Sequence, residues 1–302
     1  KETTEMEKTM KRKNILIIIL SLLVASLLAS IGFNIYQAFF SFDSYLQSTN
    51  EIYILEAGIL RNNIKFREGT DIEIKYDFEN ENYKKLEEKY NISGTAKDGT
   101  EFEKALRLMN EYAPRLTHES YYDNHIEMNA LALLEYSLNN KNHGINCRSK
   151  AQILNEMCLS LGIYSRKVWI CPNSIYDNDS HVVNEIYDTT LEKWIMLDIT
   201  NNEYWVDENN VPLSVLEIRY KAAMNEFCTP VAAGDNLKDL EKLKEKHIGD
   251  FLYIIKNLTY MQYLPKYTAN EDGDIYLLFP KNIDTKYELI ISEDSVTRSP
   301  IK

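Results

Sequence analysis

The pattern of hydrophobic and polar positions divides the chain into an apolar N-terminal stretch, a helical region and a region of short strands. A helix is predicted to begin after Thr100, because apolar residues recur there at helical spacing and Thr100 with Glu103 forms a capping-box pattern. Pro114 ends this helix. A second apolar helix is predicted over residues 126–138.

A third helix is predicted to begin at Cys147, directly after a Gly-x-Asn turn. Its apolar residues and cysteines recur at spacings of four, three, four and three, and Gly162 ends it. The residues of this stripe are Cys147, Ala151, Leu154, Cys158 and Leu161. Cys147 therefore opens the buried face of the helix.

Beyond Gly162 the pattern becomes typical of strands, with short β-branched or aromatic runs over residues 165–171, 181–187 and 193–199. Helices followed by an antiparallel sheet make an α+β fold. Weaker patterns predict a strand at 70–78, surface helices at 80–90 and 236–247, and strands at 275–279 and 287–291.

The N-terminal stretch has no charged residue from 14 to 42, and residues 15–33 are almost entirely apolar. Such a stretch can cross a bilayer, which takes about 20 residues. Basic residues precede it and aromatic residues follow it between positions 33 and 45, as at membrane interfaces. We predict a transmembrane helix at 14–33 of a single-pass protein of the cell membrane, with residues 1–13 as a cytoplasmic tail and the rest extracytoplasmic.

A cleaved signal peptide is the alternative interpretation, since residues 30–32 are small enough for cleavage. The apolar region is longer than the ~7 to 15 residues usual in signal peptides, which favours an uncleaved anchor. Either interpretation exports the remainder of the chain.

The charge of the chain argues against nucleic acid as a partner. Residues 1–13 carry five basic and three acidic side chains, so the formal net charge of −12 for all 302 residues leaves −14 for the rest. An exported domain this acidic is poorly suited to binding nucleic acid or anionic lipid by charge.

The four cysteines, at 147, 158, 171 and 228, are few for a disulfide framework, and no C-x-x-C pair is present. We therefore expect mostly buried thiols, no metal site and no cofactor. A disulfide-stabilised surface protein is a competing hypothesis, and it requires Cys147 to be bonded.

Cys147 has the position of a nucleophile. Free N–H groups at a helix N-terminus favour an anion and hence a thiolate, although a cysteine on an apolar stripe more often serves only for packing. A cysteine nucleophile needs a base, and the base needs a group that orients it. His181 begins one predicted strand and Asp198 closes the next.

A two-residue turn at 189–190 would place His181 opposite Asp198, with Cβ atoms about 4.5 to 5.5 Å apart on one face. A register shifted by one residue would place the two side chains on opposite faces.

Four segments in this order resemble the transglutaminase-like superfamily of papain-fold thiol enzymes. The segments are Gly144-Ile145-Asn146-Cys147, "LGIYSRKVWI", "HVVNEIY" and "KWIMLDIT", within residues 101–205. The resemblance implies a transglutaminase-like, papain-like core in which Cys147 is the nucleophile, His181 the general base and acid, and Asp198 the orienting group. Many relatives have Ala-Trp where this chain has Val182-Val183, and Pro where it has Ile199.

The resemblance further implies a membrane-anchored thiol enzyme that acts on carboxamide or peptide bonds by acyl transfer or hydrolysis. Its substrates would be proteins or peptides, with the cell envelope as one source. Residues 34–100 are then a stalk and leading segment, 101–235 the catalytic domain and 236–302 an accessory extension. The alternative is a non-catalytic cell-surface binding domain with the same fold.

Two further residues carry expectations. The oxyanion hole would use the backbone N–H of Cys147, and Asn129 is a candidate for the side-chain donor, although an ordinary role in its helix is the more probable interpretation. Arg166 is expected to form a structural ion pair instead of contacting substrate.

Overall fold

The computed structural model describes residues 2–174, 176–271 and 273–301. The side chains of residues 2–5, 7–9 and 38–48 lie outside this description, and with them most of the aromatic residues expected beyond the membrane span. The chain forms two compact units, residues 1–52 and 53–302.

The N-terminal unit is helical. Helix α1 (Glu2–Asn62) contains one segment, Met10–Gln37, that is long and apolar enough to cross a membrane. The helix continues through the region expected to be a stalk, because residues 34–62 contain no proline that would end it.

The larger unit is built on a seven-stranded antiparallel sheet with the strand order β6-β5-β4-β3-β2-β7-β9. The fold is therefore α+β, as predicted. The strands are β2 (Ser165–Cys171), β3 (His181–Asp188), β4 (Lys193–Asp198), β5 (Glu203–Val206), β6 (Thr229–Ala232), β7 (Tyr260–Tyr263) and β9 (Tyr276–Leu278), and β1 (Lys75–Tyr76) pairs separately with β8 (Lys266–Tyr267).

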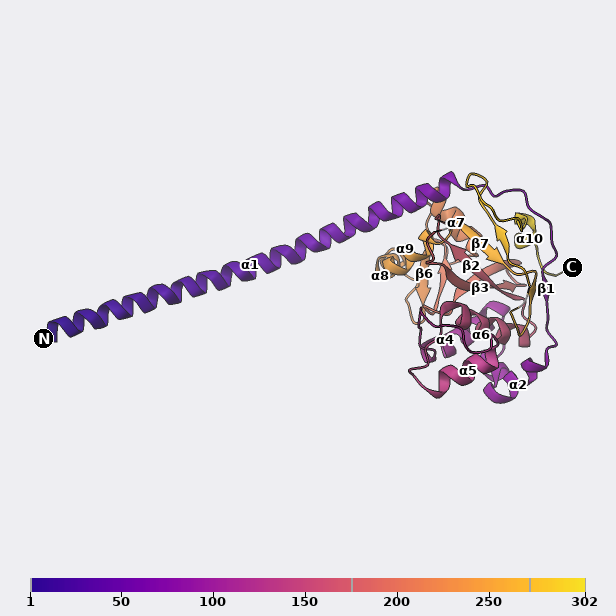
Figure 1. Ribbon diagram of the computed structural model, residues 1–302, viewed down its shortest axis with the longest axis horizontal. Helices are drawn as coiled ribbons and strands as arrows, with labels where there is room; N and C mark the ends of the chain where they lie inside the picture. Colours follow the sequence, from indigo (N-terminus) through magenta and orange to yellow (C-terminus); the bar gives the residue numbers. More distant parts are fainter. Residues whose placement is uncertain (1, 175, 272, 302) are drawn as a thin grey trace. The chain divides into compact units, whose positions relative to one another are not determined.

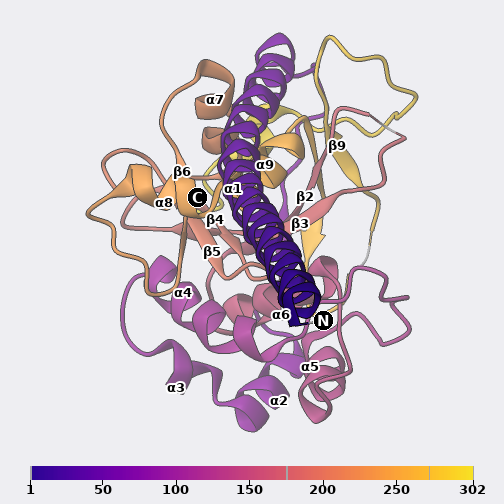
Figure 2. The same cartoon turned by 90° about the vertical axis from the view of Figure 1, so that its left-hand side faces the viewer.

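Helices cover both faces of this sheet. Helices α2, α4, α5 and α6 gather on one side of strands β2 and β3, and α7 and α9 lie on the other side (Figures 1 and 2). The helices of this unit are α2 (Glu81–Tyr90), α3 (Ile92–Ala96), α4 (Glu101–Tyr112), η1 (Ala113–Arg115), α5 (Ala130–Asn139), α6 (Cys147–Ser160), α7 (Val215–Met224), α8 (Leu240–Lys246), α9 (Ile248–Lys256) and α10 (Glu293–Thr297).

The two-residue period of the strands separates two cores. Ile186 and Ile195 contribute to the core formed with α4, α5 and α6, whereas Val183 and Met196 contribute to the core formed with α7 and α9. Both faces of the central strands are consequently buried, and the polar residues of β3, among them His181 and Glu185, are buried with them.

Several predicted elements are confirmed. The capping box of Thr100 and Glu103 is formed, and α6 begins at Cys147 and is followed by Gly162 with a φ of +74°. Residues 165–171 form β2 as predicted. Lys150 and Glu156 on α6 are also buried, so this helix is enclosed on all sides and does not have the single buried stripe that was expected.

The predictions for two strands and for the C-terminal segment were wrong. The strand expected at 70–78 is reduced to β1, and residues 287–291 form only isolated bridges, including one between Leu277 and Ile290. Residues 236–302 were expected as an accessory extension, yet they supply β7 and β9 to the central sheet. The pairing partners of these segments lie far away in sequence, so local patterns could not reveal them.

Candidate functional site

Cys147 is the first residue of α6, and the preceding turn holds the helix end in place. Asn146 is the N-cap, and its side chain accepts a hydrogen bond from the backbone N–H of Ser149 at 3.0 Å. Its amide also donates to Asn124 Oδ1 at 3.1 Å. The Cys147 thiol is partly exposed and free, whereas the other three cysteines are buried and free. The hypothesis of a disulfide-stabilised surface protein requires a bonded Cys147, whereas Cys147 is free in the structure.

His181 and Asp198 meet at the ends of β3 and β4. His181 Nε2 lies 2.8 Å from Asp198 Oδ2, and both side chains are buried. Asp198 also accepts hydrogen bonds from the backbone N–H of Thr200 at 2.9 Å and from Asn201 Nδ2 at 3.2 Å. These donors fix the carboxylate in the orientation in which it faces the imidazole.

The predicted register of this hairpin was wrong by two residues. Asp188 pairs with Lys193 and Glu185 with Met196, so the turn has four residues, 189–192, and not two. Asp188 stabilises the longer turn, because its Oδ1 accepts from the backbone N–H groups of Thr190 and Leu191. A shift of two residues keeps every side chain on its face, which is why His181 and Asp198 still meet as diagonal neighbours.

The imidazole of His181 connects Asp198 with Cys147. Its Nε2 faces the carboxylate, and a hydrogen bond with the Cys147 side chain contributes to the electrostatics of the same ring. Burial lowers the pKa of His181, but the charge and hydrogen bond of Asp198, together with Cys147, outweigh burial and raise this pKa to about 10. The structure thus brings together all three residues selected from the sequence.

Two side chains beside this cluster were missed by sequence reasoning. Lys150, one turn after Cys147 on α6, is only 2% exposed, and burial lowers the pKa of its amine while Asp198 and Cys147 oppose that shift. Tyr253 on α9 lies with its ring centroid 5.5 Å from that of His181. The sequence around Lys150 does not indicate that its side chain is buried. Tyr253 carries no local sequence signal, because its contact with His181 is made across the fold.

The segment before His181 is held by α9. Tyr253 donates a hydrogen bond to Asp179 at 3.2 Å, and the Lys256 ammonium lies 2.8 Å from the same carboxylate. Helix α9, which belongs to the segment 236–302, therefore contributes side chains to the surroundings of Cys147, His181 and Asp198.

Arg166 and Asn129 have structural contacts. Arg166 forms a buried ion pair with Glu185, with Nη2 to Oε2 at 2.6 Å, as expected. The other oxygen of Glu185 accepts from the backbone N–H of Val215, the first residue of α7. Asn129 caps α5 by accepting from the N–H of Ala132, so helix capping is its observed contact.

One other cluster has the composition of a metal site. The ligand atoms of Glu203, His247 and Asp250 all lie within 4.8 Å of one another. Burial and the nearby carboxylates of Asp250 and Asp198 raise the pKa of Glu203 to about 9. Sequence reasoning missed this cluster, because its members come from β5 and from the α8–α9 junction.

Comparison with known families identifies the domain around Cys147. Residues 88–199 match the model of the transglutaminase-like superfamily. This part of the chain is therefore similar to that superfamily, in agreement with the resemblance noted in the sequence. The matched segment contains Cys147, His181 and Asp198, so the transglutaminase-like region includes the whole candidate site.

Comparisons with individual proteins add little to this assignment. No curated protein was found to match the chain. A solved structure of a candidate cysteine protease from Cytophaga hutchinsonii is similar with 17% sequence identity and a TM-score of 0.31. The match covers 50% of this chain and 47% of that protein, so it spans about half the length of each.

Proposed function

We propose that the chain is a membrane-anchored thiol enzyme that acts on carboxamide or peptide bonds of proteins or peptides outside the cytoplasm. One observation carries the proposal: Cys147 lies at the tip of α6 and its side chain bonds to the His181 ring, whose Nε2 lies 2.8 Å from Asp198 Oδ2. A nucleophile, a base and an orienting carboxylate are the groups that such chemistry needs.

The proposed reaction begins when the Cys147 thiolate attacks the carbonyl carbon and forms a C–S bond. The negative charge that develops on the carbonyl oxygen faces the backbone N–H of Cys147. The His181 imidazolium gives its proton to the leaving nitrogen, the C–N bond breaks, and a thioester remains.

Water or an amine then attacks the thioester while His181 takes the proton of the incoming group. The C–S bond breaks and the thiolate is regenerated. Water gives hydrolysis, and a protein amine gives acyl transfer. Asp198 orients and stabilises the imidazolium in both steps through its contact with Nε2 at 2.8 Å.

The anchored arrangement rests on α1. Its segment Met10–Gln37 is apolar enough to cross a membrane, and three basic residues lie at 11–13. Because basic residues favour the cytoplasmic side, the N-terminus would be cytoplasmic and residues 53–302 extracytoplasmic.

The test measures the rate of Cys147 modification by iodoacetamide against pH in the full chain. Cys147 should react selectively, since the other three cysteines are buried. His181→Ala should slow this reaction at neutral pH at least ~10-fold, because the thiolate loses its ion-pair partner. His125→Ala, which removes an exposed histidine, is the matched control and should react like the wild type.

A second measurement follows ammonia release from glutamine-containing peptides and, separately, peptide-bond cleavage. Both Cys147→Ala and His181→Ala should abolish whichever activity the wild type shows. Equal labelling of wild type and His181→Ala, with no turnover of either substrate type, would favour the non-catalytic binding domain.

A further inference from the structure

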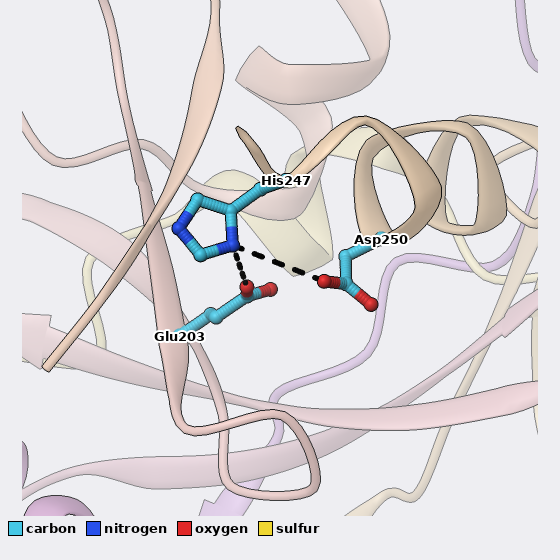
Figure 3. A group of neighbouring side chains, drawn as sticks. All are labelled: Glu203, His247 and Asp250. Carbon is cyan, nitrogen blue, oxygen red and sulfur yellow. Dashed lines mark ion pairs between the residues drawn. The ribbon is translucent and has the colours of Figure 1, made fainter. Parts of the chain in front are cut away.

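A second cluster of functional groups lies beside the candidate catalytic site. Glu203 belongs to β5, His247 lies at the junction of α8 and α9, and Asp250 is in the first turn of α9. Figure 3 shows the Glu203 carboxylate and the Asp250 carboxylate both facing one nitrogen of the His247 ring. His247 Nδ1 lies 3.1 Å from Glu203 Oε1 and 3.9 Å from Asp250 Oδ2.

The other nitrogen of His247 is already engaged. Its Nε2 lies 2.7 Å from Asp235 Oδ2, and the second oxygen of Asp235 pairs with Lys246. Metal-binding histidines usually donate their second ring N–H to a carboxylate in this way, which fixes the ring and leaves the first nitrogen free for the metal. The contact with Asp235 therefore orients the ring so that Nδ1 faces Glu203 and Asp250, as a metal ligand would.

Glu203 supplies an independent observation. The residue is 2% exposed, and its Oε2 has no hydrogen-bond partner among the described residues. In Figure 3 this second oxygen points toward the Asp250 side of the cluster. A buried carboxylate oxygen without a donor is costly, and a cation between the two carboxylates would remove that cost.

We propose that Glu203, His247 and Asp250 bind a divalent transition metal ion, with Zn²⁺ as the best match. One imidazole nitrogen with carboxylate oxygens suits Zn²⁺ better than Ca²⁺ or Mg²⁺, which prefer oxygen ligands alone. Metal–ligand bonds of about 2.0 to 2.2 Å place tetrahedral ligands about 3.3 to 3.6 Å apart.

The observed distances are close to this geometry. The 3.1 Å between Nδ1 and Glu203 Oε1 is slightly shorter than this separation and the 3.9 Å between Nδ1 and Asp250 Oδ2 slightly longer, so small movements of the two carboxylates would suffice. The Asp250 side chain is 44% exposed, so it can move by this amount, and water can occupy the fourth position. The three ligands would then connect β5 with α9.

The position of the ion suggests its role. Glu203 pairs directly with Asp198 across β4 and β5, and α9 carries Tyr253, which packs beside His181. A metal that joins β5 to α9 would hold the strand next to Asp198 and the helix next to His181 in a fixed relation. This role is structural, since no step of the proposed chemistry passes through the ion.

The experiment measures zinc binding to the full chain in detergent. The protein is stripped with EDTA, dialysed and titrated with ZnCl₂ in a calorimeter, and bound metal is then counted by mass spectrometry. All variants carry Cys147→Ala, which removes the thiolate as a competing zinc ligand. Asp250→Asn and Glu203→Gln are compared with Glu245→Gln, which removes one exposed charge from α8.

We expect the parent and Glu245→Gln to bind one Zn²⁺ per chain and to gain thermal stability from it. Glu203→Gln and Asp250→Asn should each weaken binding at least ~100-fold, and CaCl₂ and MgCl₂ should not replace zinc. Because Asp250 is half-exposed, its variant remains informative if Glu203→Gln folds poorly. Absence of zinc from the parent, or equal affinity of Asp250→Asn and the control, would overturn the proposal.

Discussion

At the scale of single residues, the environment of His181 determines what the candidate site can do. A buried histidine is normally neutral, because burial disfavours its charged form. Here Asp198 at 2.8 Å outweighs burial and raises the pKa of His181 to about 10. The imidazolium can therefore persist at neutral pH, where it can stabilise a thiolate and protonate a leaving amine.

This pKa predicts how stability depends on pH. The unfolded histidine loses its proton near pH 6.5, while the folded one keeps it up to about pH 10. The contribution of His181 to the free energy of unfolding is thus complete below pH 6.5 and is lost as pH rises through about 10.

Denaturant unfolding at pH 6, 8 and 10 measures this effect. The free energy of unfolding of the wild type should fall more steeply with pH than that of His181→Gln. The exposed His125→Gln is the control and should follow the wild type. Parallel curves for wild type and His181→Gln would contradict the assignment.

At the scale of elements, the β3–β4 hairpin positions His181 against Asp198. Its four-residue turn includes Glu192 with a φ of +52°, a region unfavourable for residues other than glycine. Asp188 offsets the cost of this backbone conformation, because its two oxygens accept hydrogen bonds from the N–H groups of Thr190, Leu191 and Phe102. One carboxylate therefore fixes the turn and attaches it to the beginning of α4.

We predict that Asp188→Ala lowers the free energy of unfolding by about 2 to 3 kcal/mol, since three N–H groups lose their acceptor. Urea titration measures the loss. Asp207→Ala is the comparison, because Asp207 caps the N–H groups of Asn209 and Val211 in an exposed turn. That variant should lose less than about 1 kcal/mol, and equal losses would show that burial of the turn is unimportant.

At the scale of the whole molecule, the last seventy residues complete the domain that surrounds the site. Strand β7 pairs with β2, and β9 pairs with β7, so the chain returns to the sheet after leaving it at β6. Helix α9 from the same region packs Phe251 and Ile254 into the core that also contains Val183. Truncation before residue 236 would therefore remove part of the sheet.

The N-terminal helix gives a prediction about the full chain. We expect the protein to stay in the membrane fraction after carbonate extraction, because Met10–Gln37 is long and apolar enough to span the bilayer. External protease added to intact cells should digest residues 53–302 while residues 1–13 remain protected. Release by carbonate would contradict the anchor, and protection of the larger unit would reverse the orientation.

The sequence by itself determined those features that depend on neighbouring residues. Helical spacing and the Asn146 cap placed Cys147 at the start of α6, and β-branched runs located β2, β3 and β4. The shared face of His181 and Asp198 was predicted from an assumed two-residue turn, and the observed four-residue turn keeps both side chains on that face because the register shifts by two residues.

Only the tertiary structure decided what depends on residues distant in sequence. It set the four-residue turn, brought Tyr253 beside His181, and placed Glu203 against His247 and Asp250. The contacts of Tyr253 and of Glu203 join segments more than forty residues apart, and no local pattern of hydrophobic and polar positions encodes which of them will meet. Packing of α9 and β7 against the sheet selects these partners, since it buries more apolar surface than either segment could bury alone.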